Sequence, residues 1–264
     1  MINKKSLTSS SGEVQTSFIE FIGPSGIGKT TFLNELVKFR GNDSSWLSNK
    51  EVQARYFPRS FYKKLENGFD YLLGRITQRD LIMEKLKISE NDVSLIISLL
   101  YENLSLREGL SWRKVRTHDY VIHQVLNQVL LYCELSFSKI VLDEGLVHNI
   151  GIPTVMKDPK KYSKLKESKL FPVSVVSFTL EADIYKERIL SRFKENKNRR
   201  INSLYDDMSD SELNEFISLT LKRSERKVEA CKLIDIPVLE ITSEITGSNL
   251  EKVNNFILKS DHQP

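Results

Sequence analysis

Four short apolar runs alternate along the chain with stretches of helical periodicity. The runs cover residues 17–23, 138–144, 173–180 and 236–244, and they are rich in β-branched and aromatic residues. Short runs of this composition, bounded by Gly, Pro or polar residues, are typical of strands buried in a parallel sheet. Because helical stretches separate the runs, the pattern predicts an α/β fold.

The first run is followed by a glycine-rich loop and then by an amphipathic pattern. The pattern predicts a helix that Gly41 ends. The apolar face of this helix is expected to comprise Phe32, Leu33, Leu36, Val37 and Phe39. Glu20 interrupts the preceding strand, and the sequence does not identify a partner for its carboxylate.

The loop matches the pattern Gly23-x-x-x-x-Gly28-Lys29-Thr30 between a predicted strand and a predicted helix. Glycines let backbone N–H groups approach an anion, and the helix N-terminus adds partial positive charge. Lys29 is expected to reach the outer phosphates of ATP, and the Thr30 hydroxyl to bind Mg²⁺. The alternative is a glycine turn without a ligand, which the flanking strand and helix disfavour. The expected nucleotide-binding residues are Gly23, Pro24, Ser25, Gly26, Ile27, Gly28, Lys29, Thr30 and Thr31.

The second run ends in two carboxylates, Asp143 and Glu144. Ligands of open α/β sheets bind at the carboxyl ends of the strands, so both acids are expected to face the glycine loop. We expect Asp143 to share the metal ion with Thr30, and Glu144 to orient or deprotonate the attacking group. The alternative is a pair of solvated acids at the start of a loop.

The third run leads into a helix that carries Arg188 and Arg192, which are four residues apart and therefore share a face. Arginine forks can hold the charge of a transferring phosphoryl group, so both residues are catalytic candidates. Residues 186–205 form a basic segment that we expect to act as a lid over the site. The alternative is a solvated cationic face. After the last run, Ser243 and Glu244 are expected to border a nucleobase.

The composition indicates the class of protein and its cellular compartment. The chain has 264 residues, of which 40% are apolar and 28% charged, as in a soluble globular protein. A net charge of +4 is too small to argue for a nucleic-acid partner. The longest apolar stretches, such as residues 93–101, are far shorter than the ~20 residues of a membrane span. Two cysteines, Cys133 and Cys231, do not suggest a disulfide framework. We expect a cytoplasmic protein, as a monomer or homodimer.

The domain organisation follows from the same pass along the chain. Residues 1–16 are polar and Ser-rich, which predicts a flexible tail. Residues 17–260 show no composition shift that would divide them, so we expect a single domain. Within it, residues 45–135 have helical periodicity, including an apolar stripe at 121–133. We interpret them as a helical insertion that covers the phosphate site and binds the acceptor.

These motifs together resemble the P-loop kinases of the nucleoside monophosphate kinase group, particularly their thymidylate-kinase-like branch. The resemblance covers "FIEFIGPSGIGKTTFLNELVK", the acid-ended strand, and "FTLEADIYKERILSRFKENKNRRIN" with the terminal strand and helix. It implies a doubly wound parallel sheet of about five strands, the P-loop NTPase fold. It also implies a mobile lid served by Arg188, Arg192 and either Arg199 or Arg200. Thymidylate kinases follow their Asp with Arg and an aromatic residue, whereas here Glu144, Gly145 and Leu146 follow.

Three classes of function remain open at this point. The first is an ATP- and Mg²⁺-dependent kinase acting on a small-molecule acceptor such as a nucleoside, a nucleotide or a sugar-like alcohol. The second is a P-loop ATPase or nucleotide-gated regulator, because an Asp-Glu pair at a strand end also suits a hydrolytic water. The third is a GTP switch, which the absence of an Asn-Lys-x-Asp motif disfavours. The sequence alone does not identify the acceptor.

Overall fold

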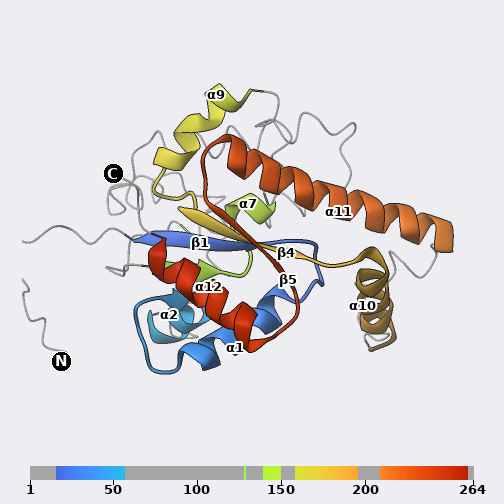
Figure 1. Ribbon diagram of the computed structural model, residues 1–264, viewed down its shortest axis with the longest axis horizontal. Helices are drawn as coiled ribbons and strands as arrows, with labels where there is room; N and C mark the ends of the chain where they lie inside the picture. The colour runs from blue at the N-terminus through green and yellow to red at the C-terminus, as the bar shows by residue number, and fades with distance from the viewer. Residues whose placement is uncertain (1–15, 57–127, 129–138, 150–157, 196–208, 261–264) are drawn as a thin grey trace, which may run out of the picture.

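In the part of the chain that the structure describes, the protein has an α/β fold built on a five-stranded parallel sheet (Figure 1). The computed structural model describes residues 16–56, 128, 139–149, 158–195 and 209–260. The strands are β1 (Ser17–Ile22), β2 (Leu47–Ser48), β3 (Lys139–Leu142), β4 (Ser174–Thr179) and β5 (Val238–Thr242). The described helices are α1 (Lys29–Arg40), α2 (Asn49–Tyr56), α7 (Leu146–Asn149), α9 (Pro159–Tyr162), the 3-10 helix η1 (Ser163–Glu167), α10 (Ala182–Glu195), α11 (Asp210–Leu233) and α12 (Gly247–Lys259).

The strands follow the order β2-β3-β1-β4-β5, with every neighbouring pair parallel. The chain therefore leaves the central strand β1 for one side of the sheet and later crosses it to build the other side. Such a reversal of strand order opens a crevice at the carboxyl ends of the strands, where ligands bind in open α/β sheets. Glu20 is paired with Leu142 in the register of β1 and β3. Asp143, the next residue, therefore lies beside the end of β1.

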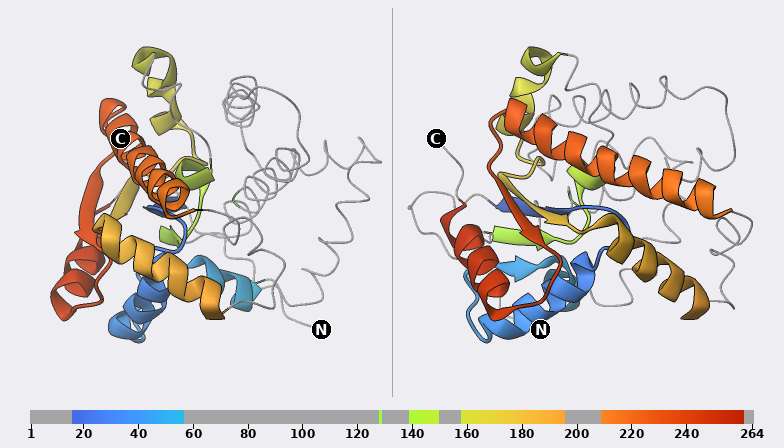
Figure 2. Two further views of the ribbon diagram at one scale, coloured as in Figure 1. Left: turned by 90° about the vertical axis from the view of Figure 1, so that its right-hand side faces the viewer. Right: turned by 45° about the vertical axis from the view of Figure 1, so that its right-hand side comes forward.

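Helices cover both faces of the sheet. Helices α1 and α12 lie on one face, and α7 and α11 lie on the other (Figures 1 and 2). Side chains alternate along a strand, and in β1 Ile19 and Phe21 belong to the core under α1 and α12. The buried members of this core are Ile19, Phe21, Ile27, Phe32, Leu33, Leu36, Trp46, Val141, Val176, Phe178, Ile241, Val253 and Ile257.

Most of the apolar face predicted for helix α1 is confirmed. Its buried apolar residues are Phe32, Leu33 and Leu36. Gly41 ends the helix with a φ of 67°, and its N–H donates to two carbonyls of the last turn. The prediction was wrong for Phe39, which is 48% exposed. The last turn buries Arg40 instead, because the Arg40 guanidinium stacks 4.4 Å from the centre of the Trp46 ring.

Helices α10 and α11 pack against each other away from the centre of the sheet. Tyr185 and Ile189 of α10 form a small apolar cluster with Leu213 and Ile217 of α11. Ser209 begins α11 with a capping box, in which its side chain and that of Glu212 satisfy each other's backbone N–H groups. Helix α11 then runs back across the face of the sheet to reach β5 (Figure 1).

Several predictions fall wholly or partly outside the described residues. These are the tail before residue 16, most of the 45–135 insertion, Cys133, and the lid beyond residue 195. The start of the insertion contributes the strand β2 to the sheet, which the periodicity did not predict. Cys231 is a buried free thiol. Among the described residues, every helix is too short or too polar to cross a membrane.

Candidate functional site

The glycine loop joins the central strand β1 to helix α1. Gly23, Gly26 and Gly28 have φ values of 140°, 89° and 109°, which side chains other than glycine rarely adopt. Gly28 immediately precedes the first residue of α1, and no side chain among the described residues caps this helix end. The first N–H groups of a helix have no intrahelical partners, so an uncapped start can receive an anion. The loop therefore combines positive-φ glycines with an uncapped helix start, an arrangement that suits an anion.

Lys29 lies across this loop. Its side chain is buried, and its ammonium group donates to the carbonyl oxygens of Gly23, at 3.1 Å, and Pro24, at 3.3 Å. These bonds hold the positive charge beside the backbone of the loop. A group with three donors can exchange a carbonyl partner for a phosphate oxygen without leaving this position.

Thr30 and Asp143 meet at the edge of the loop. The Thr30 hydroxyl donates to Asp143 Oδ2 at 2.9 Å, and the amide of Asn49 donates to Asp143 Oδ1 at 3.0 Å. Oxygen ligands of this kind suit Mg²⁺, which takes one or two carboxylates together with substrate phosphates. No cluster of three or more His, Cys, Asp or Glu in the described part of the chain offers an all-protein metal site. Thr30 and Asp143 therefore fit the metal role predicted for them.

Asn49 was not predicted from the sequence. It is the first residue of α2, and its Oδ1 is buried with no hydrogen-bond partner among the described residues. Ser48 and Glu51 form a capping arrangement at this helix start, with the Ser48 N–H and hydroxyl each 2.9 Å from Glu51 Oε2. The Ser-x-x-Glu spacing is a signal that could have located this helix and hence Asn49.

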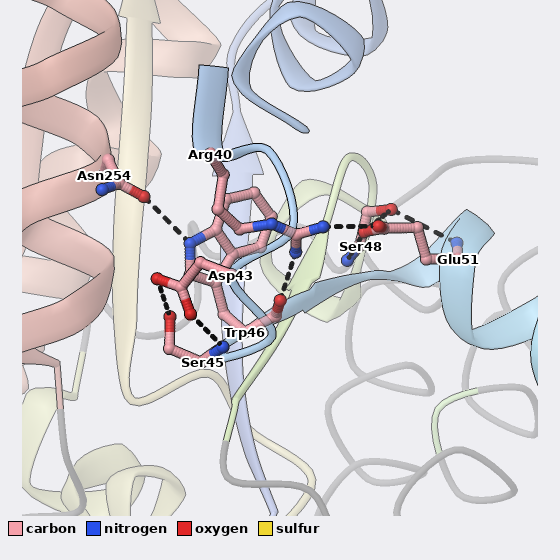
Figure 3. Close-up of polar contacts among 7 residues, drawn as sticks. All are labelled: Arg40, Asp43, Ser45, Trp46, Ser48, Glu51 and Asn254. Carbon is pink, nitrogen blue, oxygen red and sulfur yellow. Dashed lines mark hydrogen bonds and ion pairs between the residues drawn. The ribbon is translucent and has the colours of Figure 1, made fainter. Parts of the chain in front are cut away.

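A polar network anchors the start of α2 to the rest of the protein (Figure 3). Arg40 of α1 donates to Glu51 Oε1 at 2.5 Å and to the Trp46 carbonyl. The Trp46 indole N–H donates to Asn254 of α12 at 3.0 Å. Because Glu51 also holds Ser48, the network links α1 and α12 to the residue that precedes Asn49.

Two side chains of helix α10 donate hydrogen bonds to the glycine loop. Arg188 donates to the carbonyl of Ile27 at 2.6 Å and to the hydroxyl of Ser243 at 2.8 Å. The Tyr185 hydroxyl donates to the carbonyl of Ser25 at 2.8 Å. Arg188 is thus joined to the glycine loop and to the end of β5. The side chain of Arg192 lies outside the described residues.

A cavity of about 700 Å³ opens between these elements. The size lies within the range of about 300–1,000 Å³ that is usual for small-molecule sites. Glu144 lines it together with the loop, and so do Ser243 and Glu244, the residues expected to border a nucleobase. The described residues that line it are Ser25, Gly26, Gly28, Lys29, Thr30, Thr31, Glu144, Arg188, Ser191, Ser243, Glu244 and Ile245.

Ionisable groups are buried beneath the acid pair. Burial raises the pKa of Glu20 to about 7, although nearby backbone N–H groups and Lys227 lower it. Burial also lowers the pKa of His148 to about 2, helped by the charges of Lys29 and Lys227. His148 is therefore neutral at pH 7, and its approach of 3.7 Å to Glu144 is not an ion pair. Burial lowers the pKa of Lys227 to about 8, although Glu20 opposes this effect.

The structure brings most of the predicted site residues together. The glycine loop, Lys29, Thr30, Asp143, Glu144 and Arg188 all lie around one cavity or directly beside it. No protein-family model matches the chain, and no curated protein matches it. The function is therefore argued from the residues and the geometry of this site.

Proposed function

We propose that the protein is a P-loop kinase of the nucleoside monophosphate kinase group. It is an ATP- and Mg²⁺-dependent phosphotransferase that moves the γ-phosphate of ATP to a hydroxyl or phosphate of a small-molecule acceptor. The acceptor class is a nucleoside, a nucleotide or a sugar-like compound. The observation that carries the proposal is the hydrogen bond between Thr30 and Asp143, which joins the loop to the acid-ended strand.

The residues support each part of the transfer. Lys29 and the loop N–H groups hold the β- and γ-phosphates, and Arg188 covers the oxygens that gain charge. Thr30 and Asp143 would hold Mg²⁺, which would supply positive charge to the phosphate oxygens. An acceptor oxygen bonds to the γ-phosphorus while the bond to the β–γ bridging oxygen breaks, so ADP leaves. Glu144 takes the proton from an acceptor hydroxyl.

A second candidate is a P-loop ATPase or nucleotide-gated regulator. The supporting observation is that Glu144 lines the same cavity as Lys29. A carboxylate beside the phosphates can hold a hydrolytic water as well as an acceptor hydroxyl. The two candidates share the nucleotide site and differ only in what attacks the phosphorus.

The test is a screen of ATP consumption over nucleosides, nucleotides and sugars. ATP hydrolysis without an acceptor is the baseline, and EDTA serves as the metal-free control. We expect one acceptor class to raise ATP consumption well above the baseline. Consumption at full rate without an acceptor would favour the ATPase, and failure to bind ATP at all would reject both candidates.

A further inference from the structure

Glu20 is a carboxylate in the middle of the central strand, and its side chain is fully buried. Its neighbours Ile19 and Phe21 face the core under α1 and α12, so Glu20 faces α7 and α11 on the other side. A buried carboxylate is costly unless hydrogen bonds satisfy it. The buried carboxylate of Glu20 therefore requires hydrogen-bond donors on that face of the sheet.

Three backbone N–H groups provide those partners. Gly145 donates to Glu20 Oε1 at 3.2 Å, Val147 to Oε2 at 2.9 Å, and His148 to Oε1 at 2.5 Å. These groups belong to the turn after the acid pair and to the first residues of α7. N–H groups at a helix start have no intrahelical partners. Glu20 thus caps from β1 the backbone segment that directly follows Asp143 and Glu144.

Gly145 fits this carboxylate sterically. A Cβ at residue 145 would lie 2.7 Å from Glu20 Oε2 and 3.0 Å from Leu142 Cδ1. The carboxylate has little freedom to move aside, because it is buried and bonded to three N–H groups. Gly145 does not have a positive φ. The requirement for glycine after Glu144 therefore comes from the space that Glu20 occupies.

Lys227, on α11, also contacts the segment that Glu20 holds. Its ammonium group donates to the carbonyl of His148, and its charge acts on Glu20. Cys231, also on α11, and His148, on α7, are further titratable groups near this position, and the charge of Lys29 acts on both His148 and Lys227. The segment 145–148 is therefore held at its N–H groups by β1 and at a carbonyl by α11.

We propose that Glu20 is the positioning residue of the acid pair, which acts by fixing the backbone of residues 145–148 so that Asp143 and Glu144 face the glycine loop. The inference rests on the proposed function, because the proposed function assigns Asp143 and Glu144 their roles. Glu20 itself lies within the central strand β1 and is not among the residues that line the cavity. It therefore acts through Gly145, Val147 and His148.

The variants are Glu20→Gln, which keeps the shape but places an amide against the N–H groups, and Glu20→Asp, which keeps the charge. Phe18→Leu is the matched control, since Phe18 is buried in the same strand on the same face and does not line the cavity. Two measurements are made on the full chain. One is hydrogen exchange at the amides of residues 145–148 without nucleotide, and the other is kcat and KM for ATP.

In Glu20→Gln we expect faster amide exchange at residues 145–148 with unchanged exchange in β1. We also expect kcat to fall about 10–100-fold, the usual effect of losing a residue that orients a catalytic group. KM for ATP should stay unchanged, because phosphate binding rests on the glycine loop. Phe18→Leu should lower the thermal stability without changing kcat or the exchange at residues 145–148.

Gly145→Ala tests the direct contact. We expect it to lower kcat as Glu20→Gln does, and the double variant Glu20→Asp with Gly145→Ala to be more active than Gly145→Ala alone. The shorter aspartate withdraws from the added methyl group, which gives this rescue. A double variant with the summed losses of the two single variants would overturn the inference.

The inference and the proposed function fail in different ways. Normal kcat in Glu20→Gln, with or without faster exchange, would overturn the positioning role and leave the kinase proposal standing. If the wild-type chain consumes no ATP, the kinase proposal fails, and the exchange data decide alone. In that case unchanged exchange at residues 145–148 in Glu20→Gln overturns the inference, and faster exchange confined to that segment supports it.

Discussion

The hydroxyl of Thr30 donates a hydrogen bond to a carboxylate oxygen of Asp143, over 2.9 Å and 113 residues of sequence. The contact exists because β1 and β3 are adjacent parallel strands whose carboxyl ends meet at one edge of the sheet. It places a loop that suits phosphate beside an acid that suits Mg²⁺. The predictions below test what this pair and its surroundings do.

Lys29→Ala should lower ATP turnover by at least about 100-fold, since it removes the charge that faces the phosphates. Lys38→Ala is the control on the same helix, because Lys38 is exposed and pairs with Glu35 at the surface. Initial rates and thermal melting of both variants make the comparison. Full activity in a folded Lys29→Ala protein would contradict the assignment of the loop.

Asp143→Asn should lower turnover by about 100-fold and shift the Mg²⁺ dependence of the remaining rate to higher concentration. Asparagine retains an oxygen that can accept from Thr30, so the fold should persist. Asp235→Asn is the control, because Asp235 lies before β5, at the amino ends of the strands, whereas Asp143 lies at their carboxyl ends. The rate is measured against Mg²⁺ concentration. An unchanged Mg²⁺ dependence in Asp143→Asn would place the metal elsewhere.

Glu144→Gln should separate the two candidate functions. A kinase should lose transfer to its acceptor, because the amide cannot take the hydroxyl proton. An ATPase should instead retain bound ATP without hydrolysing it. Single-turnover measurements with radiolabelled ATP, with and without acceptor, distinguish these outcomes. Wild-type transfer in the variant would show that Glu144 is not the base.

Glu51→Ala should lower the free energy of unfolding by about 2–4 kcal/mol. The change leaves Arg40, whose side chain is 3% exposed, without its carboxylate partner, and it removes the cap of α2. Because Asn49 begins α2, turnover should fall as well. Glu35→Ala is the control, since it removes a surface ion pair and should change stability by less than about 0.5 kcal/mol. Urea denaturation of both variants decides; equal losses would contradict the structural role of Glu51.

The pH dependence of stability should reveal the buried Glu20. Burial raises the pKa of this carboxyl from 4.5 to about 7, so between these values the folded chain binds a proton that the unfolded chain has lost. Its contribution is therefore complete below pH 4.5 and is lost as the pH rises through 7. The stability of wild type relative to Glu20→Gln should fall by up to about 1.4 kcal/mol per pH unit in this window.

His148 provides the control of opposite sign. Burial lowers its pKa from 6.5 to about 2, so its contribution is present above pH 6.5 and is lost as the pH falls. The stability of wild type relative to His148→Asn should therefore rise with pH between about 4 and 6.5. Urea denaturation across this pH range measures both differences. A Glu20→Gln difference that does not vary with pH would show that Glu20 titrates normally.

Local patterns predicted the elements that depend on nearby residues. The first strand, the stop of α1 at Gly41, the acid-ended strand and the terminal strand and helix were all predicted correctly. Each of them depends on periodicity, on glycine backbone freedom or on turn residues within a few positions. The glycine loop belongs to the same group, because its φ values follow from its three glycines.

Other features were missed because the local signal was weak or was not used. Strand β2 has only two residues, too few to show any periodicity, and it exists because β3 offers it an edge. Helix α11 was not singled out, although Ser209 and Glu212 have the spacing of a capping box. Phe39 was wrongly placed in the core because the stacking of Arg40 on Trp46 is a tertiary contact.

The sequence by itself determined the alternation of strands and helices, the shape of the glycine loop and the acid pair that ends a strand. The tertiary structure decided which of these meet, because strand order and register set contacts between residues that are far apart in the chain. Asn49 beside Asp143, Arg188 on the loop and Glu20 beneath Gly145 are contacts of this kind. Glu20 shows the difference most clearly, since its partners are backbone N–H groups whose positions no local pattern encodes.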